Sequence, residues 1–135
     1  TIKIWNLATG NLIRTLSGHS NHIRSVAISP DGQTLVSGSS DDTIKIWNLA
    51  TGNLIRTLSG HSYLVPDVAI SPDGQTLVSG SGDTTIKIWN LATGNLIRTL
   101  SGHSHAGYSV AISPDGQTLV SGSGDKTIKI WRVSR

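Results

Sequence analysis

The pentapeptide Thr43-Ile44-Lys45-Ile46-Trp47 decides the fold, because the chain contains it four times at intervals of 42 residues. The other copies begin at Thr1, Thr85 and Thr127. A second segment, Asn-Leu-Ile-Arg-Thr-Leu-Ser-Gly-His-Ser, begins at Asn11, Asn53 and Asn95, and a third, Val-Ala-Ile-Ser-Pro-Asp-Gly-Gln-Thr-Leu-Val-Ser-Gly-Ser, at Val26, Val68 and Val110. The sequence is therefore one repeated unit, and a period of this length indicates an array of small structural repeats.

Each unit predicts four antiparallel strands, labelled a to d in chain order, because segments rich in Val, Ile, Thr and Leu alternate with turn residues. In the first complete unit the expected strands are 24–29, 34–39, 43–48 and 54–58. Ile44 and Ile46 alternate with Lys45 and Trp47, so the aliphatic side chains and the indole lie on opposite faces. Such a sheet needs a neighbour on each face, and radial stacking of these sheets gives a β-propeller. We expect an all-β fold without helices.

Length and composition exclude several classes of protein. The chain has 135 residues, which limits it to one domain, and no Cys, which excludes disulfides and thiolate sites. Its formal charge is +3, but the basic residues recur in every repeat and form no stripe, so we do not expect nucleic acid as a partner. No apolar run is long enough to span a membrane. Because the chain lacks Met and starts within a repeat, we expect a fragment, a processed product or an engineered chain, and a natural one would be cytoplasmic.

The repeats resemble the WD40 family along essentially the whole chain. In that family a His after Gly, a Ser in strand b, an Asp in the b–c turn and a Trp in strand c form a structural tetrad. The resemblance implies three such sets, all with the same internal spacing: His19, Ser37, Asp41 and Trp47; His61, Ser79, Asp83 and Trp89; His103, Ser121, Asp125 and Trp131. In each set the Asp would orient the His, the His would meet the Ser, and the Ser would meet the indole N–H.

The chain departs from the family pattern directly after each Trp. The family has Asp there, whereas this chain has Asn6, Asn48, Asn90 and Arg132. The near-identity of the copies resembles recently amplified WD40 arrays, or an engineered fragment of one.

The repeated His, Ser and Asp also raise the question of catalysis. A hydrolytic triad needs an exposed Ser oxygen beside an oxyanion hole, whereas these serines lie within expected strands. We therefore expect no catalytic residues and no enzyme. His103 and His105 stand two residues apart, but His103 belongs to a tetrad and no carboxylate or thiol is paired with it, so we expect neither a metal nor a cofactor.

The array is expected to be incomplete as a ring. The three repeats span 11–52, 53–94 and 95–135, and residues 1–9 form a surplus N-terminal strand. Three blades cannot close within one chain, since propellers need four or more. We expect head-to-tail oligomers in which strand 12–16 of one chain joins the last sheet of the next, with residues 1–9 displaced. A homotrimer with nine blades is favoured over a homodimer with six; alternatively, the chain is the tail of a longer propeller.

The repeats differ at seven positions before the C-terminal tail, and all seven map to the d–a and b–c connections at one end of each blade. Loops on a rigid frame commonly carry binding, so this end is expected to recognise a protein or peptide. The alternative is that these turns merely tolerate drift, with Ile23 and Val65 in the core and Gly107 a local weakness. The candidate ligand-binding residues are Asn21, His22, Arg24, Asp42, Tyr63, Leu64, Pro66, Asp67, Thr84, His105, Tyr108 and Lys126.

Two functions remain open at this point. The first is a non-enzymatic WD40 scaffold that recognises a protein or peptide through the d–a/b–c face. The second is an engineered or fragment-derived propeller unit whose role is self-assembly.

Overall fold

The computed structural model describes residues 1–132, apart from the side chains of residues 107 and 108. All regular structure in this range is β: β1 Ile2–Trp5, β2 Leu12–Leu16, β3 Ile23–Ile28, β4 Thr34–Ser39, β5 Thr43–Asn48, β6 Leu54–Ser59, β7 Asp67–Ile70, β8 Thr76–Gly80, β9 Thr85–Asn90, β10 Leu96–Ser101, β11 Gly107–Ile112, β12 Thr118–Ser123 and β13 Ile128–Arg132. Within the described range no helix is long and apolar enough to cross a membrane. The all-β prediction is confirmed.

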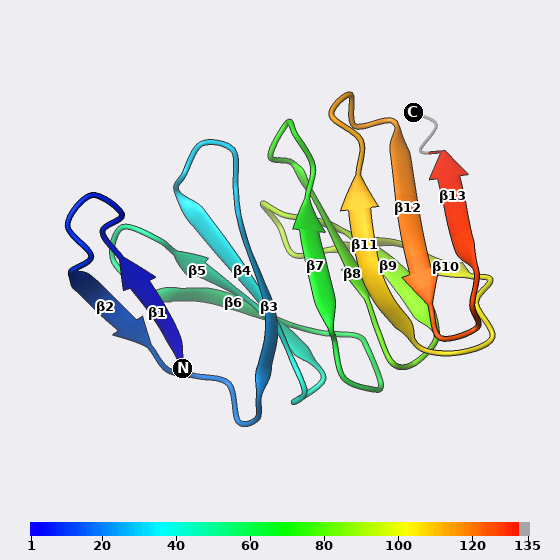
Figure 1. The fold of residues 1–135 in the computed structure, drawn as a ribbon, viewed down its shortest axis with the longest axis horizontal. Helices are drawn as coiled ribbons and strands as arrows, with labels where there is room; N and C mark the ends of the chain where they lie inside the picture. The colour runs from blue at the N-terminus through cyan, green and yellow to red at the C-terminus, as the bar shows by residue number, and fades with distance from the viewer. Residues whose placement is uncertain (133–135) are drawn as a thin grey trace.

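The strands form four separate antiparallel sheets that follow one another in chain order (Figure 1). Strands β1 and β2 form an N-terminal pair; β3 to β6 form blade 1, β7 to β10 blade 2, and β11 to β13 blade 3. Strands β3, β7 and β11 are the a strands, and each lies beside the next. The strands expected at 34–39 and 43–48 have those bounds, the one expected at 24–29 lies one residue earlier, and the one expected at 54–58 ends one residue later.

The c–d turns explain why Asn follows the tryptophans. The side-chain Oδ1 of Asn48 accepts the backbone N–H of Thr51 at 3.0 Å, and the Asn48 carbonyl accepts the N–H of Gly52 at 2.8 Å. Gly52 has a φ of 79°, a left-handed conformation that glycine adopts without steric cost. Asn48 therefore closes the turn between β5 and β6, and Asn6 and Asn90 make the corresponding bonds.

Each interior blade buries both of its faces, because the alternation along strand c directs side chains to two different neighbours. On one face of blade 1, Ile44 and Ile46 pack in the same buried cluster as Leu77 of blade 2. On the other face, Trp47 packs with Ile2 of the N-terminal pair. A third cluster joins the next face of blade 2 to blade 3, through Val78, Ile86, Ile88, Val110 and Leu119. The sheets are thus held together by apolar contacts between faces.

The C-terminal end of the array lacks this cover. Ile128 and Ile130 in β13 are 74% and 72% exposed, whereas the corresponding Ile44 and Ile46 in β5 are 1% and 2% exposed. The local sequence is the same, so the difference comes entirely from the missing neighbour. Blade 3 therefore presents an apolar face.

The N-terminal end is only partly covered. Val26 is 52% exposed, against 5% for the corresponding Val68, because the N-terminal pair has no a and b strands to lie over it. Trp5 in β1 is 54% exposed, against 2% for Trp47. In the single chain residues 2–5 are not displaced, since β1 pairs with β2; their displacement in an assembly stays a prediction.

Candidate functional site

The structure brings each set of tetrad residues together in one hydrogen-bonded chain. In blade 2, Nδ1 of His61 lies 2.9 Å from Oδ2 of Asp83, and Nε2 lies 2.7 Å from Oγ of Ser79. The indole Nε1 of Trp89 donates to the same Oγ at 2.9 Å. Because the carboxylate can only accept, His61 carries its proton on Nδ1, and the serine hydrogen is directed to Nε2. Every polar atom in this series of hydrogen bonds, from the Asp83 carboxylate to the Trp89 indole, then has a partner.

Blades 1 and 3 repeat this geometry. In blade 1 the three distances, in the order His–Asp, His–Ser and Trp–Ser, are 2.8, 2.6 and 3.0 Å. In blade 3 they are 2.8, 2.8 and 2.9 Å. The order of residues is His19, Asp41, Ser37 and Trp47 in blade 1, and His103, Asp125, Ser121 and Trp131 in blade 3.

The tetrad aspartate also ties the d–a loop to the b–c turn. Oδ2 of Asp83 accepts the backbone N–H of Ser62 at 3.2 Å, and Oδ1 accepts both the N–H and the hydroxyl of Thr85. The indole of Trp89 lies so close to Gly60 that a Cβ there would approach its ring to 2.7 Å, which explains the glycine before the histidine. The tetrad therefore sets the position of both loops that carry the variable residues.

The protonation of the tetrad follows from its surroundings. Burial alone would raise the pKa of Asp83, but hydrogen bonds from Thr85 and His61 outweigh it and hold the pKa at about 2. Burial lowers the pKa of His61 below its usual value of 6.5, although the nearby carboxylate acts in the opposite direction. The pKa of Asp125 is lowered chiefly by the Thr127 hydroxyl, and that of Asp41 by Thr43 and His19 against the effect of burial. In blade 2, ionised Asp83 and neutral His61 are thus the stable forms at neutral pH.

The tetrad serines do not offer a nucleophile. Ser37 and Ser79 are completely buried and Ser121 is 1% exposed. Each hydroxyl oxygen already accepts an indole hydrogen, so a substrate carbonyl has no approach to it. Among the described side chains, no group of three or more His, Cys, Asp or Glu residues is placed to share a metal ion.

The d–a loops and b–c turns meet at one end of each blade and form a surface that we call the variable face. In blade 1, Nε of Arg24 donates to Oγ of Ser40 at 2.6 Å. In blade 2 the ring of Tyr63 lies directly over Gly82, where a Cβ would come within 2.5 Å of Cδ1. In blades 1 and 2 the residue before the tetrad aspartate therefore contacts a variable residue, a contact that sequence comparison of the repeats did not reveal.

The residue after each tetrad aspartate has an unusual backbone conformation. Asp42, Thr84 and Lys126 have φ values of 72°, 74° and 69°, and they are the only non-glycine residues with positive φ in the described part of the chain. A β-branched residue such as Thr84 rarely adopts this conformation. Three different side chains therefore occupy one strained position of the variable face, and strained positions are often found at functional sites.

The remaining candidates fall into two groups. Asn21, His22, Arg24, Tyr63, His105 and Lys126 are exposed, whereas Asp42, Leu64, Pro66 and Thr84 are half-buried. Val65 is fully buried and Ile23 packs against a buried cluster, so both belong to the core. The side chain of Tyr108 and the surroundings of Gly107 lie outside the part of the chain that the structure describes.

Asp67 has a structural role that the sequence analysis missed. Its Oδ1 accepts the hydroxyl of Ser25 at 2.9 Å, and its Oδ2 accepts the backbone N–H of Val110 at 2.9 Å. One carboxylate therefore links the a strands of all three blades. Its place among the candidate ligand contacts stays a prediction, and both of its oxygens accept these structural bonds. The other two repeats have Ser25 and Ser109 at this position, so the change to aspartate was the sequence signal that could have indicated this role.

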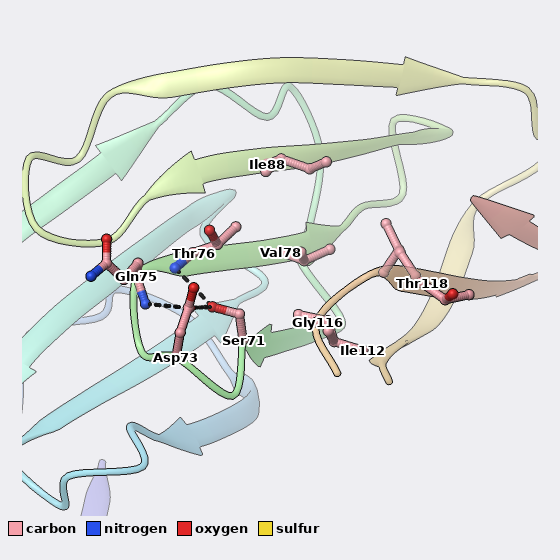
Figure 2. A pocket seen from close by; sticks show the side chains of 10 residues that line it. Ser71, Asp73, Gln75, Thr76, Val78, Ile88, Ile112, Gly116 and Thr118 are labelled. Carbon is pink, nitrogen blue, oxygen red and sulfur yellow. Dashed lines mark hydrogen bonds between the residues drawn. The ribbon is translucent and has the colours of Figure 1, made fainter. Parts of the chain in front are cut away.

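A cleft of about 300 Å³ lies between blades 2 and 3 at the opposite end of the blades, where the Pro-Asp-Gly turns are (Figure 2). Val78, Ile88, Ile112 and Leu119 are among the residues that line it. At the junction of blades 1 and 2, Leu91 packs in the buried cluster formed by the corresponding residues. The residue that corresponds to Leu91 in blade 3 lies outside the described residues, so this cleft supports no ligand site.

Comparison with known proteins agrees with this geometry. The family model described as "WD domain, G-beta repeat" matches residues 10–48, 52–90 and 94–132, so the chain belongs to the WD40 family. Similar proteins include the nuclear distribution protein PAC1 of Coccidioides posadasii, 46% identical over 41 residues, which are 30% of this chain and 9% of that protein. FIZZY-RELATED 1 of Arabidopsis thaliana is 45% identical over 42 residues, 31% of this chain and 9% of that protein. The small ribosomal subunit protein RACK1y of Oryza sativa is 42% identical over 43 residues, 32% of this chain and 13% of that protein. Each match thus spans about one repeat and a small part of the relative.

The tetrads predict a loss of stability in acid. A group whose pKa is lowered by folding stabilises the folded state above its unfolded pKa, and this contribution is lost as the pH falls towards the folded pKa. For His61 the loss begins below the usual pKa of 6.5, and for Asp83 it runs from the usual pKa of about 3.8 down to about 2. Urea unfolding at pH 7, 5 and 3 should therefore give a falling free energy of unfolding, with the steeper fall below pH 4.

The matched variant Asp83→Asn keeps an acceptor oxygen and removes the charge. It should be less stable at pH 7 and should lose less stability between pH 5 and 3 than the unsubstituted chain. Equal free energies of unfolding at pH 7 and pH 3 would contradict the account.

Proposed function

We propose that this chain is a non-enzymatic WD40 scaffold that recognises a protein or peptide through its variable face. The observation that carries the proposal is that all differences among the repeats before the C-terminal tail lie at the end of the blades that the tetrads hold in place. Buried tetrad serines argue against hydrolysis at these sites. The relatives support the class: RACK1y is by name a protein of the small ribosomal subunit, and so part of a larger assembly.

The chemistry of the variable face suits contact with a protein. Tyr63 is exposed and its ring rests on Gly82, so it is already ordered before a partner arrives. Arg24 is exposed and held by Ser40 in a similar way. Tyr and Arg are common anchors of protein interfaces, and anchors that are ordered beforehand lose less entropy on binding.

Selection from a displayed peptide library against the immobilised chain tests this function. Selected peptides should bind at least about tenfold more weakly to the triple variant Arg24→Ala, Tyr63→Ala and Lys126→Ala, since loss of anchors commonly costs 1 kcal/mol or more. The matched control is Gln33→Ala, Gln75→Ala and Gln117→Ala, which changes three residues next to the Pro-Asp-Gly turns. Binding that survives the first variant and is lost in the control would contradict the proposal.

A second function, self-assembly, is favoured by a separate observation: both ends of the array expose side chains that are buried at the interior junctions. A second copy supplies the missing parts. Blade 3 of one chain has strands a, b and c but no d strand, and β2 of the next chain is a d strand that lacks strands a and b. Contacts of this head-to-tail type close into a ring when the rotation allows it. We favour a trimer with nine blades over a dimer with six. Nine is nearer than six to eight blades, so the contacts between blades are strained less in the trimer.

Light scattering on a gel-filtration column tests the assembly. The chain mass is 14.2 kDa, and the expected result is one species of three chain masses at high protein concentration. Two chain masses would show a six-bladed ring in place of nine blades. A single chain mass at all concentrations would contradict self-assembly and leave recognition as the remaining function.

A further inference from the structure

Strand β1 lies beside β2 and over the Trp47 face of blade 1, and β13 of a second copy of the chain fits the same place. In blade 1, β5 pairs with β6 in the register Ile44 with Leu58, Lys45 with Thr57 and Ile46 with Arg56. In the N-terminal pair, β1 pairs with β2 in the same register, with Ile2 opposite Leu16. Strand β2 is therefore held as a d strand, and β1 occupies the place of its c strand.

The sequence Thr-Ile-Lys-Ile-Trp of β1 is identical to residues 127–131, which include most of β13. The edge of β13 away from β12 has no partner strand in the described chain. We propose that β1 is an intramolecular placeholder, and that β13 of a second copy replaces it beside β2. This inference rests on the self-assembly proposed above and adds to it the site, the competing strand and the register.

The exchange conserves what β1 contributes. Lys3 Nζ donates to Thr15 Oγ1 at 3.3 Å, and the corresponding bond from Lys45 to Thr57 is 2.9 Å, so Lys129 of an incoming copy finds the same acceptor. Ile2 is buried against the Trp47 face of blade 1, and Ile128 has the same shape and the same place in the repeat. The ladder broken within one chain is thus formed again between two chains.

The exchange also gains contacts that β1 cannot make. Trp5 is exposed and its strand belongs to no tetrad, whereas the indole of Trp131 already donates to Ser121. β13 belongs to the same sheet as β11 and β12, so these two strands come with it. They are the a and b strands that the N-terminal pair lacks, and they would cover Val26. Burial of Ile128, Ile130 and Val26 removes apolar surface from water, which favours the intermolecular form.

A polar contact at the inner edge of the blades agrees with the same register. At the first interior junction the N–H of Val68 points to Oγ of Ser25 at 3.4 Å, and at the second the N–H of Val110 points to Asp67 at 2.9 Å. Ser109 holds the corresponding acceptor position in blade 3, and Val26 of the next copy holds the corresponding donor position. The incoming blade therefore continues the series of hydrogen bonds between a strands.

Two variants with the same substitutions in the same motif test the placeholder. Ile2→Ser with Ile4→Ser weakens β1, and Ile128→Ser with Ile130→Ser weakens β13. If β1 competes with β13, the first variant assembles at lower concentration than the unsubstituted chain, because a larger fraction of molecules has β2 free. We expect a shift of about tenfold or more in the midpoint of assembly, measured by sedimentation velocity across a dilution series. The second variant should remain a single chain.

Each other outcome has a defined meaning. An unchanged or higher midpoint for the β1 variant overturns the placeholder and leaves self-assembly standing. Single-chain mass for both the unsubstituted chain and the β1 variant overturns the placeholder and self-assembly together. A shortened chain of residues 10–135 is the second test should the serine variant misfold, and it too should assemble at lower concentration than the full chain.

Discussion

The structure depends on one constraint: each blade is a sheet that is apolar on both faces, so it is stable only between two neighbours. The constraint follows from strand c, where Ile44 and Ile46 alternate with Trp47 and direct apolar groups to both sides. Blade 2 has cover on both faces, whereas blade 1 leaves Val26 exposed, and blade 3 and the N-terminal pair expose further apolar side chains. The same residues are therefore buried or exposed according to position in the array, and both ends of the described array expose apolar side chains.

The tetrads solve a different problem, which is to hold two loops at the end of a sheet that is otherwise ordered by apolar contacts. A neutral histidine between an ionised aspartate and a serine provides directional bonds where packing alone provides none. Because the aspartate also binds the d–a loop and the b–c turn, sequence can change between these anchors without loss of the frame. Tyr63 over Gly82 and Arg24 on Ser40 show that such changes occur in matched pairs.

Most of the fold could be predicted from the sequence, because identical repeats allow each strand and turn to be inferred three times over. The strand order and the two-faced packing follow from the spacing of a few residues, and the three tetrads follow from the resemblance to the WD40 family. The structural role of Asp67 could not be predicted, since its partners Ser25 and Val110 lie 42 and 43 residues away and meet it only where three sheets converge. Whether β1 or β13 of a second copy lies beside β2 in an assembly could not be predicted from sequence alone, because both strands carry Ile-Lys-Ile-Trp.

Hydrogen exchange of the β13 backbone tests the central claim most directly, since it reports whether the open face of blade 3 acquires a neighbouring strand. The account predicts that the amides on the edge of β13 away from β12 exchange about as slowly as those of β5 at high protein concentration. On dilution to the single chain they should exchange rapidly while β5 remains protected. Rapid exchange in β13 at every concentration, with β5 protected throughout, would contradict the claim that a second copy completes the array.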